Sequence, residues 1–209
     1  QIIKNMVQYT VLYFFMEKIS EKAKRELDKL LEGNRCFVEG IVVEKNMCVE
    51  TLKKFAFHQN PGAVILTCSD SRVVPEIIFN CGIGEIFVIR VAGMTTGPNI
   101  IESVEYAVKS LKVPLLVLLG HDDCGVMKYA HEKFPNEPKD YCSLLNCVYP
   151  VFEGKNDMEH ADEVALKHTY LVENVLLNRS EIVKNAVKNG ELYIAKCHLD
   201  HSSGVVKLI

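Results

Sequence analysis

Short apolar runs alternate along this chain with longer stretches in which apolar residues recur at helical spacing. Four runs are too short for helices and are bounded by turn residues, which predicts buried strands at residues 63–68, 85–91, 114–120 and 191–197. A fifth strand is expected at residues 204–209, after the turn HSSG. This pattern predicts an α/β fold with a mostly parallel central sheet of four to five strands flanked by helices.

The segments between the strands carry the helical pattern. The helix expected from about residue 99 has a capping signal, because Asn99 is followed three residues later by Glu102. Asp70 and Arg72, in contrast, lie in a short stretch that we expect to be extended. The further helices are expected over residues 15–34, 42–57, 75–81, 126–133, 159–177 and 180–189.

The chain of 209 residues is expected to form one domain over residues 1–209, because no repeat or long linker divides it. Residues 7–16 are rich in apolar and aromatic side chains, yet the apolar stretch falls well short of the ~20 residues that span a membrane. So many exposed aromatic side chains would favour association. We therefore expect residues 1–34 to form an N-terminal helical arm that packs on a partner subunit, with no membrane contact.

The charges limit the class of partner. Lysine and arginine total 24 against 27 aspartates and glutamates, the net charge is −3, and both signs are interspersed. No basic stripe indicates nucleic acid, so we expect a small molecule or a second copy of the chain as the partner. The eight cysteines are scattered rather than clustered, which favours reduced thiols and a cytoplasmic protein.

Two strand ends carry the residues that suggest chemistry. Cys68 follows the strand at 63–67, while His121 and Cys124 follow the strand at 114–120. The carboxyl ends of neighbouring parallel strands meet at one edge of a sheet, so these three side chains can converge. Two thiolates and an imidazole suit zinc, and three protein ligands with an open fourth position are typical of a catalytic site.

Asp70 and Arg72 follow Cys68 closely, and we expect both side chains to lie on the same side of the backbone. An ordinary surface ion pair would be worth about 0 to 1 kcal/mol and would mean little. Beside a metal-bound hydroxide, however, Asp70 could accept a hydrogen bond while Arg72 keeps it ionised and fixed.

The remaining cysteines and histidines are given structural roles. We expect the other cysteines to be inert core thiols: Cys36, Cys48, Cys81, Cys142, Cys147 and Cys197. We expect the other histidines to lie on the surface or to make local hydrogen bonds: His58, His131, His160, His168, His198 and His201.

These motifs resemble the β-class carbonic anhydrases. The resemblance lies in CSDSRVVPEIIF at 68–79, IFVIRVAG at 86–93, SVEYAVKSLKV at 103–113 and GHDDCG at 120–125. It continues in LLEGNRCFVEG and GELYIAKCHLDHSSGVV, so that it covers nearly the whole chain from about Leu30, in order.

The resemblance implies a carbonate dehydratase with one Zn²⁺ per chain, in which zinc-bound hydroxide hydrates carbon dioxide reversibly to bicarbonate and a proton. Cys68, His121 and Cys124 would hold the zinc. Asp70 and Arg72 would form the catalytic dyad, with Asp70 as a possible fourth ligand. A carbonyl sulfide or carbon disulfide hydrolase on the same fold, and a non-catalytic zinc-binding relative, are the alternatives.

The family also implies a substrate pocket and an oligomer. Gln59, Phe87, Tyr106 and Gly125 match positions that bind or enclose the substrate. In the family some of these come from the neighbouring subunit, so we expect a homodimer or a homotetramer.

Two residues depart from the family pattern near the expected site. Met94 stands where the family often has Asn, and Asp122 stands where Ser is common after the metal-binding His. A carboxylate at position 122 adds negative charge, which would disfavour formation of hydroxide.

Overall fold

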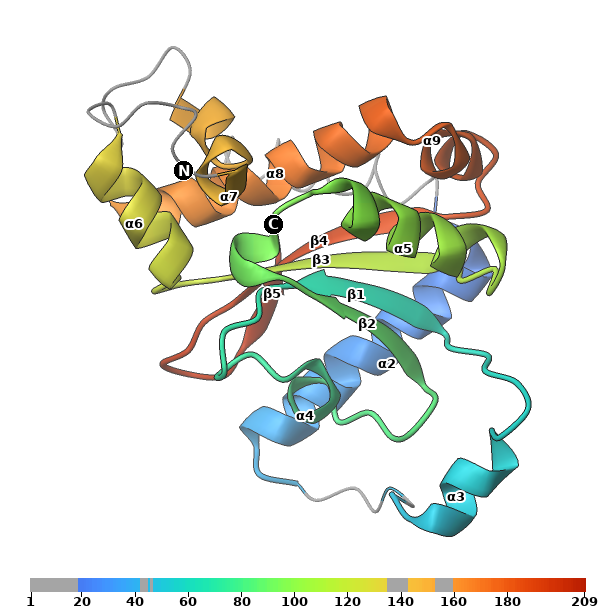
Figure 1. The fold of residues 1–209 in the computed structure, drawn as a ribbon. Coiled ribbons are helices and arrows are strands. Elements are labelled where there is room, and N and C mark those ends of the chain that lie inside the picture. The colour runs from blue at the N-terminus through green and yellow to red at the C-terminus, as the bar shows by residue number, and fades with distance from the viewer. Residues whose placement is uncertain (1–18, 42–44, 46, 135–142, 153–159) are drawn as a thin grey trace, which may run out of the picture.

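The computed structural model describes residues 19–41, 45, 47–134, 143–152 and 160–209, in which the strands form one five-stranded sheet of order β2-β1-β3-β4-β5 (Figure 1). Four parallel strands are joined by one antiparallel strand at the β5 edge. The strands are β1 (Ala63–Thr67), β2 (Ile86–Arg90), β3 (Leu115–His121), β4 (Tyr193–Leu199) and β5 (Val206–Leu208). The predicted α/β fold with a mostly parallel sheet is thus confirmed.

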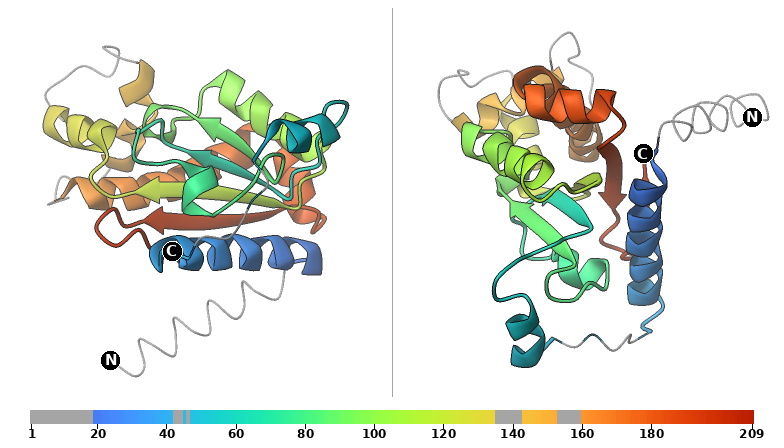
Figure 2. Two further views of the ribbon diagram at one scale, coloured as in Figure 1. Left: turned by 90° about the horizontal axis from the view of Figure 1, so that it is seen from below. Right: turned by 90° about the vertical axis from the view of Figure 1, so that its right-hand side faces the viewer.

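Helices cover both faces of the sheet (Figure 2). On one face, α5 (Pro98–Lys109), α8 (Ala161–Arg179) and α9 (Glu181–Lys188) pack on alternate residues of β1 and β3. On the other, α2 (Glu21–Val38) and α4 (Pro75–Ile78) pack on the residues between them. The remaining elements are α3 (Val49–Lys54), η1 (Ala92–Met94), α6 (Gly125–Lys133), α7 (Ser143–Asn146) and η2 (Tyr149–Phe152).

The order of the strands creates a switch point between β1 and β3. The connection from β1 to β2 runs through α4 on one face, whereas the connection from β2 back to β3 runs through α5 on the opposite face. The chain leaves the carboxyl end of β1 toward β2 and the carboxyl end of β3 toward β4, in opposite directions along the sheet, and ligands bind at such points in open α/β sheets. Cys68 and His121 lie at this point.

The helix predicted to end at Gly33-Asn34 continues to Val38, so this boundary is wrong. Ser20 caps the start of α2, its hydroxyl accepting from Ala23 N at 3.2 Å. Gly33 serves close packing rather than termination, because a Cβ there would lie 1.9 Å from the carbonyl oxygen of Phe79.

Two other helix boundaries are also wrong. The helix expected over residues 42–57 is reduced to α3, although residues 42–44 and 46 lie outside the described part. The cap of α5 is Gly97 rather than Asn99, because Pro98 occupies the first helical position, where its missing N–H costs nothing.

The N-terminal arm can be followed only from Ile19, since residues 1–18 lie outside the described part of the chain. Its described helix, α2, packs on the chain's own sheet through Leu27 and Leu30. Contact of the arm with a partner subunit stays a prediction. Among the described residues, no helix is long and apolar enough to cross a membrane.

Candidate metal centre

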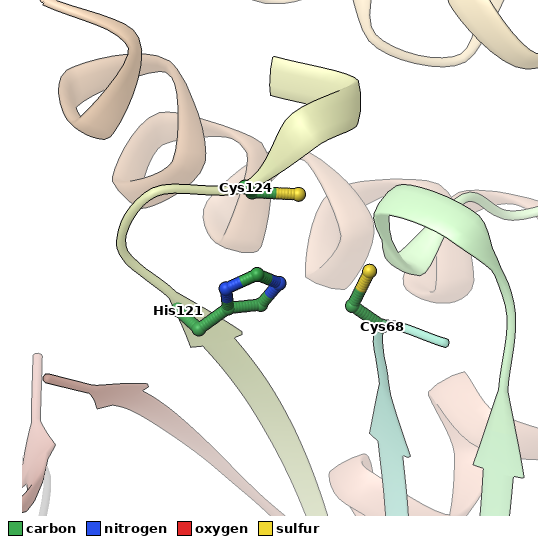
Figure 3. Close-up of side chains that lie close together, drawn as sticks. All are labelled: Cys68, His121 and Cys124. Carbon is green, nitrogen blue, oxygen red and sulfur yellow. The ribbon is translucent and has the colours of Figure 1, made fainter. Parts of the chain in front are cut away.

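Three side chains from separate elements converge at the switch point (Figure 3). Cys68 follows β1, His121 is the last residue of β3, and Cys124 is the N-cap of α6. One ligand atom of each lies within 4.8 Å of the others, and all three residues are buried, with exposures of 6%, 2% and 2%. The predicted convergence is confirmed, and within the described ranges this is the one such group of potential metal ligands.

The chemistry of His121 fits a metal ligand. Its Nδ1 lies 2.7 Å from the carbonyl oxygen of Asp122, which can only accept, so Nδ1 carries the proton. The lone pair of Nε2 is therefore free, and this buried atom has no hydrogen-bond partner among the described residues. Ligand atoms around a tetrahedral zinc lie about 3.5–3.8 Å apart, which the observed cluster can approach with small movements.

The two thiols are coupled. The Cys124 thiol, hydrogen-bonded to Cys68, is the largest cause that holds the pKa of Cys68 well below its ordinary value, while the same contact raises the pKa of Cys124. The amide of Gly93 also donates to Cys68 Sγ at 3.2 Å. The two sulfurs thus share a proton, which a metal would have to displace before both could bind it as thiolates.

Asp70 and Arg72 form a forked ion pair beside the cluster. Arg72 Nε donates to Asp70 Oδ1 at 3.0 Å and Arg72 Nη2 donates to Asp70 Oδ2 at 2.8 Å. The guanidinium of Arg72 is the main cause that lowers the pKa of the Asp70 carboxyl, which is ionised at neutral pH. The two residues do not lie in an extended stretch as expected: Val73 N donates to Asp70 O at 2.9 Å, and this turn brings them together.

Arg72 is held on its other side by Asp123. Nη1 donates to Asp123 Oδ2 at 2.9 Å and Nη2 to the Asp123 carbonyl at 3.1 Å, while Lys128 pairs with the second carboxylate oxygen. Asp123 has a left-handed backbone, with φ of 54°. It links the loop between His121 and Cys124 to the Asp70–Arg72 pair.

Sequence reasoning did not identify three of the contributing residues. Besides Gly93 and Asp123, Arg90 supports the loop after β1, because its Nη2 donates to the Asp70 carbonyl at 2.7 Å and its Nε to the Cys68 carbonyl at 3.3 Å. Arg90 could have been recognised in the sequence, because it ends a predicted strand. In the structure that strand lies beside β1, with Arg90 in register with Thr67. No sequence signal marks the backbone amide of Gly93.

The four residues expected to form the substrate pocket do not lie together within one chain. Gly125 is exposed and adjoins Cys124. Gln59 precedes β1, at the opposite end of the strand from Cys68, and Phe87 pairs with Val64, about 13 Å along the strand from Cys68. Tyr106 is 48% exposed on α5 and lies against Phe87, with ring centroids 6.1 Å apart. Within one chain Gln59, Phe87 and Tyr106 are not brought to the cluster.

The two departures from the family pattern have defined surroundings. Met94 is buried and has a left-handed backbone, with φ of 51°, a conformation that Asn adopts more readily than Met. The Asp122 carboxylate faces the turn after β4, because Oδ1 accepts from His201 N at 2.9 Å and lies 3.2 Å from His201 Nδ1. Its charge is thus partly satisfied by His201, whose ring lies against that of His121 with centroids 4.9 Å apart.

The three candidate ligand residues border a small cavity, which is separate from a larger cavity elsewhere in the described part of the chain. A cavity of about 10 Å³ is bounded by the three ligand residues together with Met94 and His168. Ten cubic ångströms is close to the least volume that holds a water molecule. A larger cavity of about 610 Å³ lies at the amino ends of β1 and β2, shares no residue with the cluster and is lined by paired charges such as Lys45 and Glu85.

Two structural assignments from the sequence need correction. Cys48 is exposed, not a core thiol, and Cys147 is partly exposed, while Cys142 lies outside the described residues. His168 is not on the surface: it is 1% exposed, on the buried side of α8.

The chain matches known proteins over most of its length. The family model described as carbonic anhydrase matches residues 63–206. Carbonic anhydrase 2 of Mycobacterium tuberculosis is 37% identical over 170 residues, which cover 79% of this chain and 82% of that protein.

Solved structures agree with this match. A β-carbonic anhydrase of Coccomyxa superposes with a TM-score of 0.64 at 26% identity, covering 86% of this chain and 84% of that one. A tetrameric β-carbonic anhydrase of Sordaria macrospora gives 0.63 at 24% identity, covering 77% and 86%. The chain therefore belongs to the β-class carbonic anhydrase family.

Proposed function

We propose that this protein is a zinc-dependent carbonate dehydratase that hydrates carbon dioxide reversibly to bicarbonate and a proton. One observation carries the proposal: Cys68, His121 and Cys124 converge within 4.8 Å directly beside the ionised Asp70, which Arg72 holds. Membership of the carbonic anhydrase family supports the same reaction.

Cys68, His121 and Cys124 would hold one Zn²⁺ and leave a fourth position for the reaction. Zinc bound there supplies a Lewis acid that lowers the pKa of a water molecule and so provides a nucleophile near neutral pH. Two thiolates neutralise most of the charge of the ion, which makes this acidification harder than with three imidazoles. The Gly93 amide offsets part of this effect, because its hydrogen bond withdraws electron density from the Cys68 sulfur.

Asp70 orients the reacting water in this proposal. Its carboxylate is held at neutral pH in the ionised form, which only accepts hydrogen bonds. Oδ1 already accepts from the backbone N and the Nε of Arg72, whereas Oδ2 keeps a lone pair beyond the one that Arg72 Nη2 occupies. A water that donates to Asp70 turns its remaining lone pairs toward the carbon of the substrate. Arg72 fixes the position of Asp70 and is itself fixed by Asp123.

A second subunit would complete the substrate pocket. Gln59, Phe87 and Tyr106 lie too far from the cluster of their own chain, and Tyr106 is accessible on the surface. We infer that these residues serve the site of a neighbouring copy in a homo-oligomer. The Sordaria macrospora relatives are described as tetrameric, which supports assembly of this kind.

The test compares three samples of the same preparation: zinc-loaded, stripped with a chelator, and reconstituted with zinc. We expect carbon dioxide hydration in the first and third samples only. Hydrogen sulfide release from carbonyl sulfide and carbon disulfide is measured in parallel. Faster hydrolysis of either sulfur compound than hydration of carbon dioxide would replace the proposal with the sulfur hydrolase, and a zinc-loaded sample without any of the three activities would indicate a non-catalytic zinc protein.

A further inference from the structure

A histidine that the proposed mechanism does not use lies beside the metal centre. His168 belongs to α8 and is 1% exposed. It borders the same small cavity as Cys68, His121 and Cys124, yet it is not among the residues whose ligand atoms cluster. Its place on α8 follows from spacing, because Val164, His168 and Val172 recur every four residues on the buried side of the helix.

The imidazole of His168 bonds the backbone of the loop that carries Gly93. Nε2 lies 3.4 Å from the Met94 carbonyl, which can only accept, so Nε2 carries the proton and donates. Burial lowers the pKa of His168 to about 4, so the ring is neutral and this tautomer persists at physiological pH.

The loop that accepts this hydrogen bond has an unfavourable backbone conformation. Gly93 and Met94 both adopt left-handed backbone angles, with φ of 64° and 51°. For a non-glycine residue such as Met94 this conformation is unfavourable and needs support from its surroundings. The conformation directs the Gly93 amide to Cys68 Sγ at 3.2 Å and the Met94 carbonyl to His168.

Packing alone does not explain a histidine at position 168. Its Nδ1 is buried and has no hydrogen-bond partner among the described residues. An unpaired buried polar atom destabilises a fold, so an apolar side chain of similar size would serve packing at least as well. The polar ring is therefore accounted for by the contact that it makes with the loop.

We propose that His168 is a positioning residue of the metal centre: by holding the Met94 carbonyl, it keeps the Ala92–Met94 turn in the conformation from which Gly93 donates to the Cys68 sulfur. The inference rests on the proposed function only in taking Cys68 as a zinc ligand. It needs no carbon dioxide chemistry.

The test measures zinc affinity, by chelator competition, in the full-length chain and in three variants. His168→Leu removes the donor and keeps the volume, whereas His168→Gln keeps an N–H near the position of Nε2, the atom that donates to the Met94 carbonyl. Val172→Ala, one turn further along the buried side of α8, creates a cavity away from the metal centre and serves as the matched control. Thermal unfolding of each zinc-free protein and the thiolate-to-cobalt absorption band of each Co²⁺-loaded protein are recorded as well.

His168→Leu should weaken zinc binding by about tenfold or more, as loss of a residue that supports a metal ligand typically does. The same variant should shift the cobalt band, while its zinc-free form unfolds close to the wild-type temperature, because loss of the hydrogen bond to Met94 offsets the removal of the unpaired Nδ1. His168→Gln should stay within about threefold of the wild-type affinity. Val172→Ala should unfold at a lower temperature and bind zinc normally.

Wild-type zinc affinity and an unmoved cobalt band in His168→Leu would overturn the inference. An affinity loss in His168→Leu accompanied by an unfolding temperature as low as that of Val172→Ala would also overturn it, because packing would then be the cause. So would an equal affinity loss in His168→Gln. Failure of the proposed function is seen separately: a wild-type protein that binds zinc without hydrating carbon dioxide leaves the affinities of these variants interpretable.

Discussion

Arg72 donates two parallel hydrogen bonds to the carboxylate of Asp70, from Nε to Oδ1 at 3.0 Å and from Nη2 to Oδ2 at 2.8 Å. Asp70 is accordingly absent from the group of ligand atoms formed by Cys68, His121 and Cys124. With zinc bound by these three residues, as we propose, a fourth position would remain for water, and the Asp70 carboxylate would serve as a hydrogen-bond acceptor beside it.

Asp70→Asn should lower the turnover number by about 100-fold, because the amide cannot replace an ionised acceptor. Zinc content should stay near one per chain, since the three ligands are untouched.

Arg72→Lys should lower turnover by about tenfold, because an ammonium group cannot make the two parallel hydrogen bonds that the guanidinium makes. Stopped-flow hydration and metal analysis check both. Arg35→Gln, which removes an exposed arginine from α2, is the control and should be fully active.

Cys124→Ser should lose zinc, because a serine hydroxyl is a far poorer ligand than a thiolate. Metal analysis after gel filtration measures the loss. Cys48→Ser removes an exposed thiol far from the cluster and should keep the wild-type zinc content. Equal zinc in both variants would show that the metal binds elsewhere.

Gly93→Ala should destabilise the chain by about 1–3 kcal/mol and weaken zinc binding, because a Cβ there would lie 2.6 Å from Val126 Cγ1 on a backbone with φ of 64°. Urea unfolding of the zinc-free protein and chelator competition measure the two effects. At Gly82 a Cβ would meet only ordinary contacts, so Gly82→Ala is the matched control. Normal zinc affinity in Gly93→Ala would contradict the role given to the Gly93 amide.

Acid should remove the stabilising contribution of Asp70. Arg72 holds the folded-state pKa of Asp70 below its ordinary value of 3.8, so the contribution is fully present above about pH 4 and is lost as pH falls further toward the folded-state pKa. Urea unfolding of zinc-free wild type and Asp70→Asn between about pH 6 and pH 3 should show a stability difference that narrows on acidification. A difference that widens would reverse the sign of the interaction.

A site shared between subunits predicts complementation. Cys124→Ser lacks the metal half, and Gln59→Ala lacks part of the substrate half. In coexpressed dimers about one quarter of the sites should combine two intact halves and recover activity. A mixture of Cys124→Ser with Cys68→Ser should recover none, because both lesions lie in the same half. Activity no higher than the average of the two separate variants would argue that each chain is self-sufficient.

The centre of the sheet could be predicted from the sequence because β1 and β3 are wholly buried. β1 and β3 appear as uninterrupted apolar runs between turn residues, so their positions were predicted within one residue. The metal centre followed, because Cys68 and His121 stand at the ends of those strands. The two strands with the clearest apolar pattern are thus the ones that position Cys68 and His121.

Helix ends were predicted less well because tertiary contacts override local signals. Gly33 and Asn34 look like a helix stop, yet Gly33 lies under Phe79 and the Asn34 side chain bonds the backbone of Ile78, Gly204 and Val206. Such contacts join segments that lie far apart in the sequence, so a local pattern could not reveal them.

The supporting residues of the metal centre were hidden for a related reason. Gly93 acts through its backbone amide, which every residue except proline has, and His168 is distinguished only by its place on the buried side of α8. Asp123 could not be predicted from the sequence, because two acidic neighbours in a loop usually indicate solvent exposure. Its contact with Arg72 depends on a turn in the loop after β1, which brings the two residues together.

The most direct test of the central claim is stopped-flow carbon dioxide hydration by the zinc-loaded wild type between about pH 6 and pH 9, with zinc content measured on the same sample. We expect about one zinc per chain and a turnover that rises with pH as a proton is lost at the metal centre. Full activity in a zinc-free sample, or no hydration by the zinc-loaded protein up to about pH 9, would contradict the account.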